Sequence, residues 1–450
     1  MNRYIGISLN DDYAGICVNN EDSAKPVPTV VCKVKKEDRW LIGEEAYKAT
    51  LSGDGIIVDK LLNLLKKEGT ATIDHVKYSA IELLAHYFAE LLRKAREEKP
   101  ELHTDAEQPS SIIEVAEVKN EKKEAQAEAE TVAADTDVPE EDHDYVVVSL
   151  RQPEKRTLQL VKTALIRAGV EEECIRVISH TESFAHFVLH QDSNLYNRLV
   201  GMFELSNQCL YYYEMQVSRG SRKFVLVDSE QEEEAFNLDT LKTTSGGKIA
   251  DKILSSLAER VIGKKYYSAI FLSGRGFEDT SYCTNFMNLI CNRRRVLIEP
   301  GIFAIGAELF AKKVANHEPE EYTILCDTRV SADISIRVVV NEKEMNYPIV
   351  TAGESWVDTE KNVEMILDDQ NYIDFQVNSM LRTRRPMRLR MLLDEFPKRE
   401  NRTTRVRMST EFVNQDILRV TVRDMGFGDL VSTSGKEITE EIDLSESSSS

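Results

Sequence analysis

Two strand–turn–strand segments, far apart in the sequence, constrain the fold of this chain more than any other feature. The first predicted hairpin has strands at residues 4–9 and 13–18, joined by a polar turn at 10–12. The second has strands at residues 199–205 and 209–217, again around a short polar turn. The segments that follow alternate strand and helix patterns, which is typical of parallel strands joined by crossover helices. A block repeated in this way predicts a duplicated, bilobal α/β fold with a cleft between its halves.

Composition divides the rest of the chain into further units. Residues 99–144 are rich in Glu, Ala and Asp with almost no aromatic residue, so this segment cannot bury enough apolar surface to offset its ordering entropy. We predict an acidic disordered insertion there, which splits the first lobe into residues 1–98 and 145–198. Residues 199–318 form the second predicted lobe, which lacks an upper subdomain. Residues 319–443 show the short alternating patterns of an antiparallel β domain, and 444–450 read as a disordered tail.

The charge balance and the lack of a long apolar run limit the classes of partner. A net charge of −20 repels the phosphate backbone of nucleic acids, so we expect no nucleic-acid partner. No apolar run reaches the roughly 18 residues of a membrane span, and the N-terminus lacks the pattern of a signal peptide. We therefore expect a cytoplasmic protein. Seven scattered cysteines without a C-x-x-C pair predict reduced, buried thiols and no metal site.

Several segments, in the same order along the chain, resemble motifs of the 70-kDa heat-shock (DnaK-type) chaperone family of the actin-like ATPase superfamily. YIGISLNDDYAGICV looks like its first phosphate motif, LVGMFELSNQCLYYYEM its second, and FLSGRGFEDTSYCTNFM its adenosine motif. Residues 145–187 and 299–313 are similar to its connecting regions, and 369–377 and 412–442 to its peptide-binding β domain. The resemblance implies a bilobal actin-like fold, a duplicated ribonuclease-H-like ATPase, followed by an all-β peptide-binding-like sandwich.

The resemblance also assigns nucleotide-site positions to this chain, and most of them depart from the family pattern. In the first phosphate turn, which Tyr13 follows, Ser8 replaces the family's Asp and Asn10 replaces its Gly. Asp11 and Asp12 replace two hydroxyl residues. In the second, an Asp and three glycines are replaced by Glu204, Ser206, Asn207 and Gln208. The family's catalytic lysine, catalytic glutamate and a further magnesium-side aspartate correspond to Lys60, His180 and Tyr211.

These departures predict a site that does not hydrolyse ATP. Side chains at residues 206–208 would occupy space that glycine leaves open for phosphate. Two neighbouring carboxylates, Asp11 and Asp12, would add repulsion of about 1 kcal/mol or more. Between residues 247 and 267 there is room only for a helix and a turn, where the family has a subdomain that lines the adenine pocket. We therefore expect no catalytic residue and no cofactor. ATP and magnesium would be cofactors only if the chain is an active ATPase.

Two glycine-containing turns are weaker candidates for the same nucleotide site. Gly246 and Gly247 precede a predicted helix, and Gly274 with Arg275 follows a predicted strand. Glycines at such places are also common in plain turns. His180 likewise fits a buried histidine with no role as a base.

A basic run stands out in this acidic chain as a candidate partner-binding surface. It consists of Arg382, Arg384, Arg385, Arg388 and Arg390. The run predicts either a surface for an acidic partner, including the chain's own residues 120–144, or the charged solvent side of an edge strand.

Three functions follow from these observations. The favoured one is a DnaK-like protein-binding or scaffold module with a degenerate, non-hydrolysing nucleotide cleft, that is, a pseudo-ATPase. The alternatives are an ATP-dependent molecular chaperone and an actin-like structural or cell-division component. The expected partners are proteins or peptides, and the sequence leaves the oligomeric state open.

Overall fold

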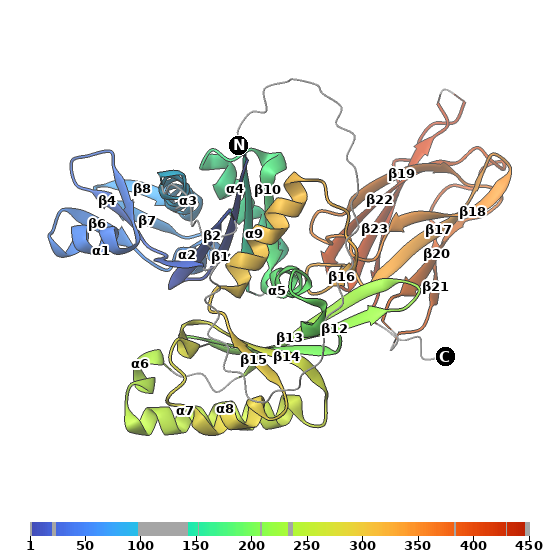
Figure 1. Ribbon diagram of the computed structural model, residues 1–450. Helices are drawn as coiled ribbons and strands as arrows, with labels where there is room; N and C mark the ends of the chain where they lie inside the picture. The colour runs from blue at the N-terminus through green and yellow to red at the C-terminus, as the bar shows by residue number, and fades with distance from the viewer. Residues whose placement is uncertain are drawn as a thin grey trace, which may run out of the picture.

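The computed structural model describes residues 2–19, 24–97, 143–151, 153–207, 209–232, 237–381, 384–428 and 430–445. Most of the predicted insertion at 99–144 and of the predicted tail at 444–450 therefore lies outside the described residues, and so do Gln208 and Arg382. A helix-containing part built on two large sheets precedes a part built of strands (Figure 1). Among the described residues, no helix has the length and apolar character needed to cross a membrane.

The first large sheet has the strand order β10–β9–β1–β2–β3. Its strands are β1 (Arg3–Leu9), β2 (Tyr13–Val18), β3 (Lys25–Pro28), β9 (Asp144–Leu150) and β10 (Ile175–Ser179). β1 pairs antiparallel with β2 and parallel with β9, so that Ser8 lies opposite both Gly15 and Ser149. The last five residues of β1 and of β9 are all buried, as is typical of parallel strands covered on both faces.

Helices cover both faces of this sheet. On one face, α3 (Ala80–Glu97) and α4 (Lys155–Arg167) pack on the apolar side chains of β1 and β9. On the other face, α9 (Ile302–Ala315) crosses β1 and β9 and contacts α5 (His180–Leu189). The α9 backbone lies directly on Gly6, where an added Cβ atom would be 2.0 Å from the Ala304 carbonyl oxygen. A glycine at residue 6 is therefore required for this packing.

The second large sheet has the strand order β15–β14–β11–β12–β13–β16. Its strands are β11 (Leu199–Ser206), β12 (Cys209–Arg219), β13 (Lys223–Glu232), β14 (Tyr267–Ser273), β15 (Arg295–Ile298) and β16 (Thr323–Leu325). The core on one face includes side chains of α7 (Thr244–Ile262) and α8 (Thr284–Cys291), and the core on the other includes side chains of α5 and α9. α5 and α9 therefore lie between the two large sheets, and α9 contributes side chains to the cores against both (Figure 1).

Smaller elements complete the helix-containing part. A three-stranded sheet is formed by β4 (Val31–Val34), β5 (Trp40–Ile42) and β6 (Gly55–Val58), and a hairpin by β7 (Thr70–Ile73) and β8 (Val76–Ser79). The short helices are α1 (Gly43–Leu51), α2 (Leu61–Lys66) and α6 (Leu238–Leu241), with 3-10 turns η1 (Glu172–Cys174), η2 (Ser193–Leu195) and η3 (Arg275–Phe277).

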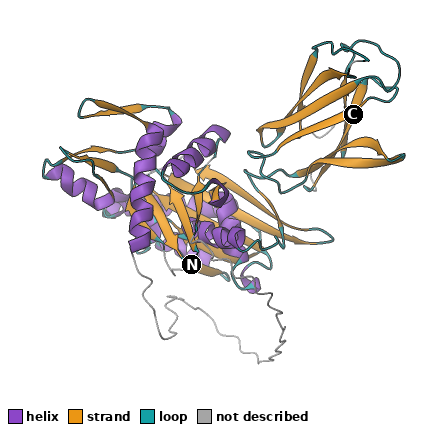
Figure 2. Cartoon of the chain, turned by 90° about the horizontal axis from the view of Figure 1, so that it is seen from above, coloured by secondary structure: helices purple, strands orange, loops and turns teal. Residues whose placement is uncertain are grey.

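Residues 332–443 form two four-stranded antiparallel sheets without a described helix (Figure 2). One sheet contains β17 (Ala332–Val340), β18 (Lys343–Val350), β20 (Tyr372–Ser379) and β21 (Met387–Leu392). The other contains β19 (Glu360–Ile366), β22 (Arg405–Asn414), β23 (Ile417–Gly426) and β24 (Glu437–Asp443). Side chains from both sheets form one common core, which includes Phe375, Phe412 and Val420.

A buried ion pair stabilises one end of this strand-rich part. Arg399 binds both carboxylate oxygens of Asp424 at 2.7 Å, and the backbone amides of Gly426 and Ser434 donate to the same carboxylate. Burial alone would raise the pKa of Asp424, but these donors outweigh burial and lower the pKa well below the usual carboxyl range.

The predicted fold class is wrong. We expected a bilobal actin-like α/β fold followed by an all-β sandwich, whereas the described residues hold 41% strand and 28% helix, with the strands divided over six sheets. The strands of the described residues form sheets of two, three, four, five and six strands rather than two matched lobes. Motifs and periodicity report on short local segments, whereas the order and size of the sheets depend on long-range pairing that such segments do not encode. The division into domains stays a prediction.

Candidate functional site

A cavity of about 1220 Å³ lies where strands of the two large sheets end. β1, β11 and β14 direct their carboxyl ends toward it, which is where ligands commonly bind in sheets with parallel strands. Most of the residues predicted from the sequence line this one cavity. They are Ser8, Asn10, Asp11, Asp12, Tyr13, Lys60, Glu204, Ser206, Asn207, Gly274 and Arg275.

Glu204 forms a buried ion pair with Arg151 at the centre of the cavity wall. The two side chains are 3% and 15% exposed. Arg151 binds one oxygen of Glu204, Ser206 donates to the same oxygen at 3.2 Å, and Tyr213 donates to the other at 3.0 Å. Both carboxylate oxygens of Glu204 therefore already have protein partners.

Arg151 is held from a second direction by an aromatic ring. Its guanidinium carbon lies 4.9 Å from the centroid of the Tyr211 ring, within range of a cation–π contact. Burial alone would lower the pKa of Arg151, but the Glu204 carboxylate outweighs burial and raises this pKa above its ordinary value. Arg151 therefore stays charged, and its contacts with Glu204 and Tyr211 fix its place in the wall.

The predicted phosphate turns contact each other and their surroundings through side chains. Asp11 accepts a hydrogen bond from the backbone amide of Asn63 at 2.8 Å, in the first turn of α2. Asp12 accepts one from Asn207 at 3.3 Å, which links the turn after β1 to the turn after β11. The guanidinium of Arg275 stacks 4.2 Å from the centroid of the Tyr13 ring. The Asp12–Asn207 and Arg275–Tyr13 contacts bridge the cavity between its two sheets.

Magnesium-bound triphosphate does not fit this set of residues. Such a ligand needs carboxylates free to hold the waters of the metal and backbone amides that can approach phosphate closely. Glu204 is paired with Arg151, and the side chains of Asp12 and Asn207 meet in the space between the two turns. We therefore derive no catalytic step through a nucleotide or a metal at this cavity.

His180 lies beneath the cavity rather than on its wall. Its side chain is buried, its Nε2 atom is 3.4 Å from Ser8 Oγ, and its ring stacks on Phe303 with the centroids 3.9 Å apart. Burial, with a smaller contribution from Arg151, lowers the pKa of His180 well below its ordinary value. The imidazole is therefore neutral and has no direct access to a ligand in the cavity.

The three predicted glycines separate into two groups. Gly246 and Gly247 do not line the cavity, and a Cβ atom on Gly246 would be 2.1 Å from the Thr240 carbonyl oxygen. Gly274 lines the cavity with φ +86°, and a Cβ atom there would be 2.5 Å from the Leu205 carbonyl oxygen. At both positions the close approach of backbone explains the glycine without a ligand.

Of the four described arginines in the predicted basic run, two are paired with acidic residues and two are exposed. Arg384 donates to Asp416 and to the Leu444 carbonyl at 3.1 Å each. Arg390 binds Asp374 through two hydrogen bonds. Arg385 and Arg388 are exposed, and neither forms an ion pair with a described acidic residue. Arg388 lies on β21, which is an edge strand of its sheet.

Sequence reasoning missed Arg151 and Glu299, which also line the cavity. Arg151 directly follows the buried strand β9, and the end of a parallel strand is a place where binding residues are expected. Burial raises the pKa of Glu299, whose carboxylate accepts a hydrogen bond from the Gly301 amide at 3.0 Å. Nothing in the local sequence distinguishes Glu299 from an ordinary turn residue.

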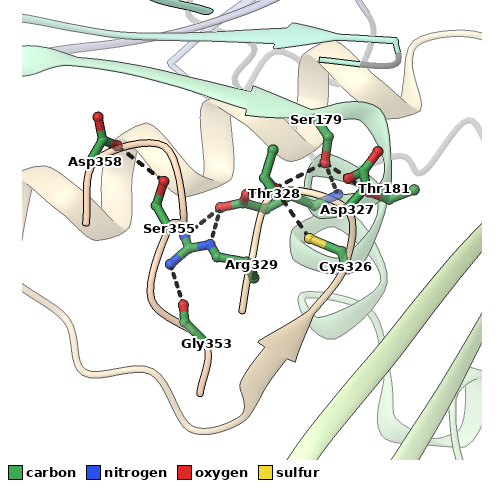
Figure 3. A network of polar contacts seen from close by, with 10 residues as sticks. Ser179, Thr181, Cys326, Asp327, Thr328, Arg329, Gly353, Ser355 and Asp358 are labelled. Atoms are coloured by element: carbon green, nitrogen blue, oxygen red, sulfur yellow. Dashed lines mark hydrogen bonds and ion pairs between the residues drawn. The ribbon is translucent and has the colours of Figure 1, made fainter. Parts of the chain in front are cut away.

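A second polar network joins the segment after β16 to α5 (Figure 3). Arg329 binds the buried Glu182 through two of its nitrogens and donates to the Gly353 carbonyl at 2.8 Å. Thr328 donates to the other oxygen of Glu182 at 2.5 Å. Trp356 donates to the Asp327 carbonyl at 2.7 Å. The network therefore ties the chain that leads into β17 to the helix-containing part.

Two family models match the chain, and the boundary between them falls at this network, between residues 327 and 329. A model described as "Family of unknown function (DUF5716) C-terminal" matches residues 12–106 and 132–327. A model described as "Domain of unknown function (DUF8552)" matches residues 329–444. No curated protein matches the chain. Neither description mentions a chaperone or an ATPase, so the likeness to the 70-kDa heat-shock family stays a prediction. Because the first model covers more than half of the 450 residues, this chain is a member of the DUF5716 family.

Proposed function

We propose that this chain is a cytoplasmic protein-binding or scaffold module whose cavity does not hydrolyse nucleotide. The observation that carries the proposal is the buried Arg151–Glu204 ion pair, which uses a carboxylate that phosphoryl transfer would need for a metal. Ser206 and Tyr213 complete the hydrogen bonding of that carboxylate. The Glu204 carboxylate thus has hydrogen-bond donors from the protein itself, which supports a structural role for this part of the cavity wall.

The charge of the cavity supports the same conclusion. Eight Asp and Glu side chains line it, against five Lys and Arg side chains. This excess of acidic side chains disfavours a triphosphate.

Protein binding is supported by the edge of the strand-rich part. Among the described strands, β21 pairs on one side only, with β20. It carries the exposed Arg388, and the exposed Arg385 lies just before it. An acidic extended segment of a partner would pair with the edge through backbone hydrogen bonds and contact these arginines. The predicted partner is therefore an acidic protein or peptide.

An ATPase assay tests the first half of the proposal. The full chain, incubated with magnesium and radiolabelled ATP under single-turnover conditions, should release phosphate at the rate of buffer alone. Asp12→Asn serves as the matched control, because it removes a carboxylate from the cavity without touching the Arg151–Glu204 pair. Magnesium-dependent turnover that Asp12→Asn abolishes would instead favour the ATP-dependent chaperone.

A peptide titration tests the second half. An acidic extended peptide should bind the wild-type chain, and the double variant Arg385→Ala/Arg388→Ala should bind it about tenfold more weakly, since two exposed charges contribute about 0.7 kcal/mol each. Arg407→Ala is the control, because Arg407 is already paired with Glu364 on the other sheet. Equal binding by the double variant and the control would show that Arg385 and Arg388 do not contribute to peptide binding.

A further inference from the structure

Three potential metal ligands meet at the end of the first sheet opposite the cavity. His143, Glu171 and Cys174 each offer a ligand atom, and the three atoms lie within 4.8 Å of one another. His143 immediately precedes β9, whose carboxyl end leads into the cavity at Arg151. At about 3.3 Å per residue, the length of β9 places the cluster roughly 20 Å from the cavity wall.

The pairing of β9 with β10 brings these residues together. The two strands are parallel, with Val146 opposite Ile175, so their amino ends lie side by side. The His143 carbonyl accepts a hydrogen bond from the Arg3 amide at 2.9 Å, which fixes the backbone before β9. The Cys174 amide donates to the Glu171 carbonyl at 3.0 Å, which closes the η1 turn before β10. Two ordered backbone segments therefore hold all three side chains.

The distances within the cluster are close to those of a tetrahedral ion site. The Glu171 carboxylate oxygen lies 2.9 Å from His143 Nδ1 and 4.0 Å from Cys174 Sγ. A tetrahedral ion with bonds of about 2.0–2.3 Å separates its ligand atoms by about 3.3–3.7 Å. Shifts of about half an ångström would bring both Glu171 distances to these values, and His143 and Cys174 lie within 4.8 Å of each other.

Two acidic residues near the cluster, Asp144 and Glu172, are paired with basic side chains. Asp144 is paired with Arg3 and Arg96 on its other side. Glu172 is paired with Lys162 at 3.0 Å. Among the described residues, no lysine or arginine forms an ion pair with Glu171, whose carboxylate faces the imidazole and the thiol.

We propose that His143, Glu171 and Cys174 bind a divalent cation of the zinc class, with the fourth coordination position open to water or a small ligand. Imidazole nitrogen, carboxylate oxygen and thiolate sulfur are the three donor types that zinc accepts in proteins. The site escaped prediction because His143 is distant in sequence from the other two ligands, and no C-x-x-C pair marks it.

Cobalt(II) substitution tests the proposal with the full chain. Metal-free protein titrated with Co²⁺ alone should bind one ion with a sulfur-to-cobalt charge-transfer band, and added Zn²⁺ should remove the band. Cys174→Ser should lose the band, whereas Cys291→Ser, at an exposed free thiol outside the cluster, should keep it. Glu171→Gln, a change at an exposed side chain, should keep the band but weaken Co²⁺ binding about 100-fold or more.

The result that overturns the proposal is equally direct. No charge-transfer band in the wild-type chain, or a band that persists in Cys174→Ser, excludes Cys174 as a ligand. Unchanged Co²⁺ affinity in Glu171→Gln excludes the three-residue site. Near-ultraviolet circular dichroism of each variant, matched to that of the wild type, separates loss of binding from loss of folding.

Discussion

Replacing Arg151 by methionine removes one partner of the buried pair on the cavity wall. The variant Arg151→Met keeps most of the side-chain volume but leaves the Glu204 carboxylate, which is 3% exposed, without its counter-charge. Loss of one partner from a buried pair costs about 3–5 kcal/mol. Tyr213 and Ser206 still donate to Glu204, so we expect the lower end, about 3 kcal/mol.

The double variant Arg151→Met/Glu204→Gln separates charge from packing. It removes the uncompensated carboxylate, so the free energy of unfolding should return to within about 1 kcal/mol of the wild type. Arg407→Met is the exposed control. The Arg407–Glu364 pair is 2.6 Å long, but its side chains are 49% and 44% exposed, so its loss should cost less than about 1 kcal/mol.

Urea unfolding followed by tryptophan fluorescence measures these differences. The chain has two tryptophans, and a Trp356→Phe background leaves Trp40, in the helix-containing part, as the reporter. The reasoning is refuted if Arg151→Met and Arg407→Met destabilise equally, or if adding Glu204→Gln makes the Arg151→Met protein less stable still.

Three further predictions test other parts of the account. Gly6→Ala should destabilise the chain by about 3 kcal/mol or more because its Cβ atom would collide with the α9 backbone, whereas Gly220→Ala, with open space around it, should be near neutral in the same urea assay. The lowered pKa of Asp424 means that its ionised form contributes stability above the unfolded pKa of about 3.9, and that this contribution is lost as the pH falls through the folded pKa. The excess stability of the wild type over Asp424→Asn should therefore be constant above about pH 5 and shrink below about pH 4 in urea titrations. Arg329→Met leaves the buried Glu182 without its partner, so limited proteolysis should cut the chain near the network faster than in the wild type. An unchanged rate of cleavage would contradict the inference that this ion pair stabilises the connection to β17.

Local structure was largely predictable from the sequence. The hairpin predicted at residues 4–9 and 13–18 corresponds to β1 and β2, and the predicted hairpin at 199–205 and 209–217 to β11 and β12. Alternation and helical spacing are set by which face of an element is buried, so they are visible in the sequence. The assembly of strands into sheets was not predictable from the sequence. It depends on pairings such as that of β1 with β9, whose residues are more than a hundred positions apart.

The candidate site was predictable in its membership but not in its contacts. The turns after β1 and β11 were expected to face one another, and their residues line one cavity. The pairing of Glu204 with Arg151 was not expected, because the sequence shows which residues end strands but not which charges neutralise each other. His180 illustrates the same limit, since its burial against Phe303 depends on where α9 crosses.

Calorimetric titration of the full chain with ATP and magnesium tests whether the cavity binds nucleotide. If Glu204 is committed to Arg151 and the Asp12–Asn207 contact occupies the space between the two turns, the titration should give no binding heat at millimolar nucleotide. Saturable binding at micromolar concentration, weakened by Glu204→Gln, would contradict the account.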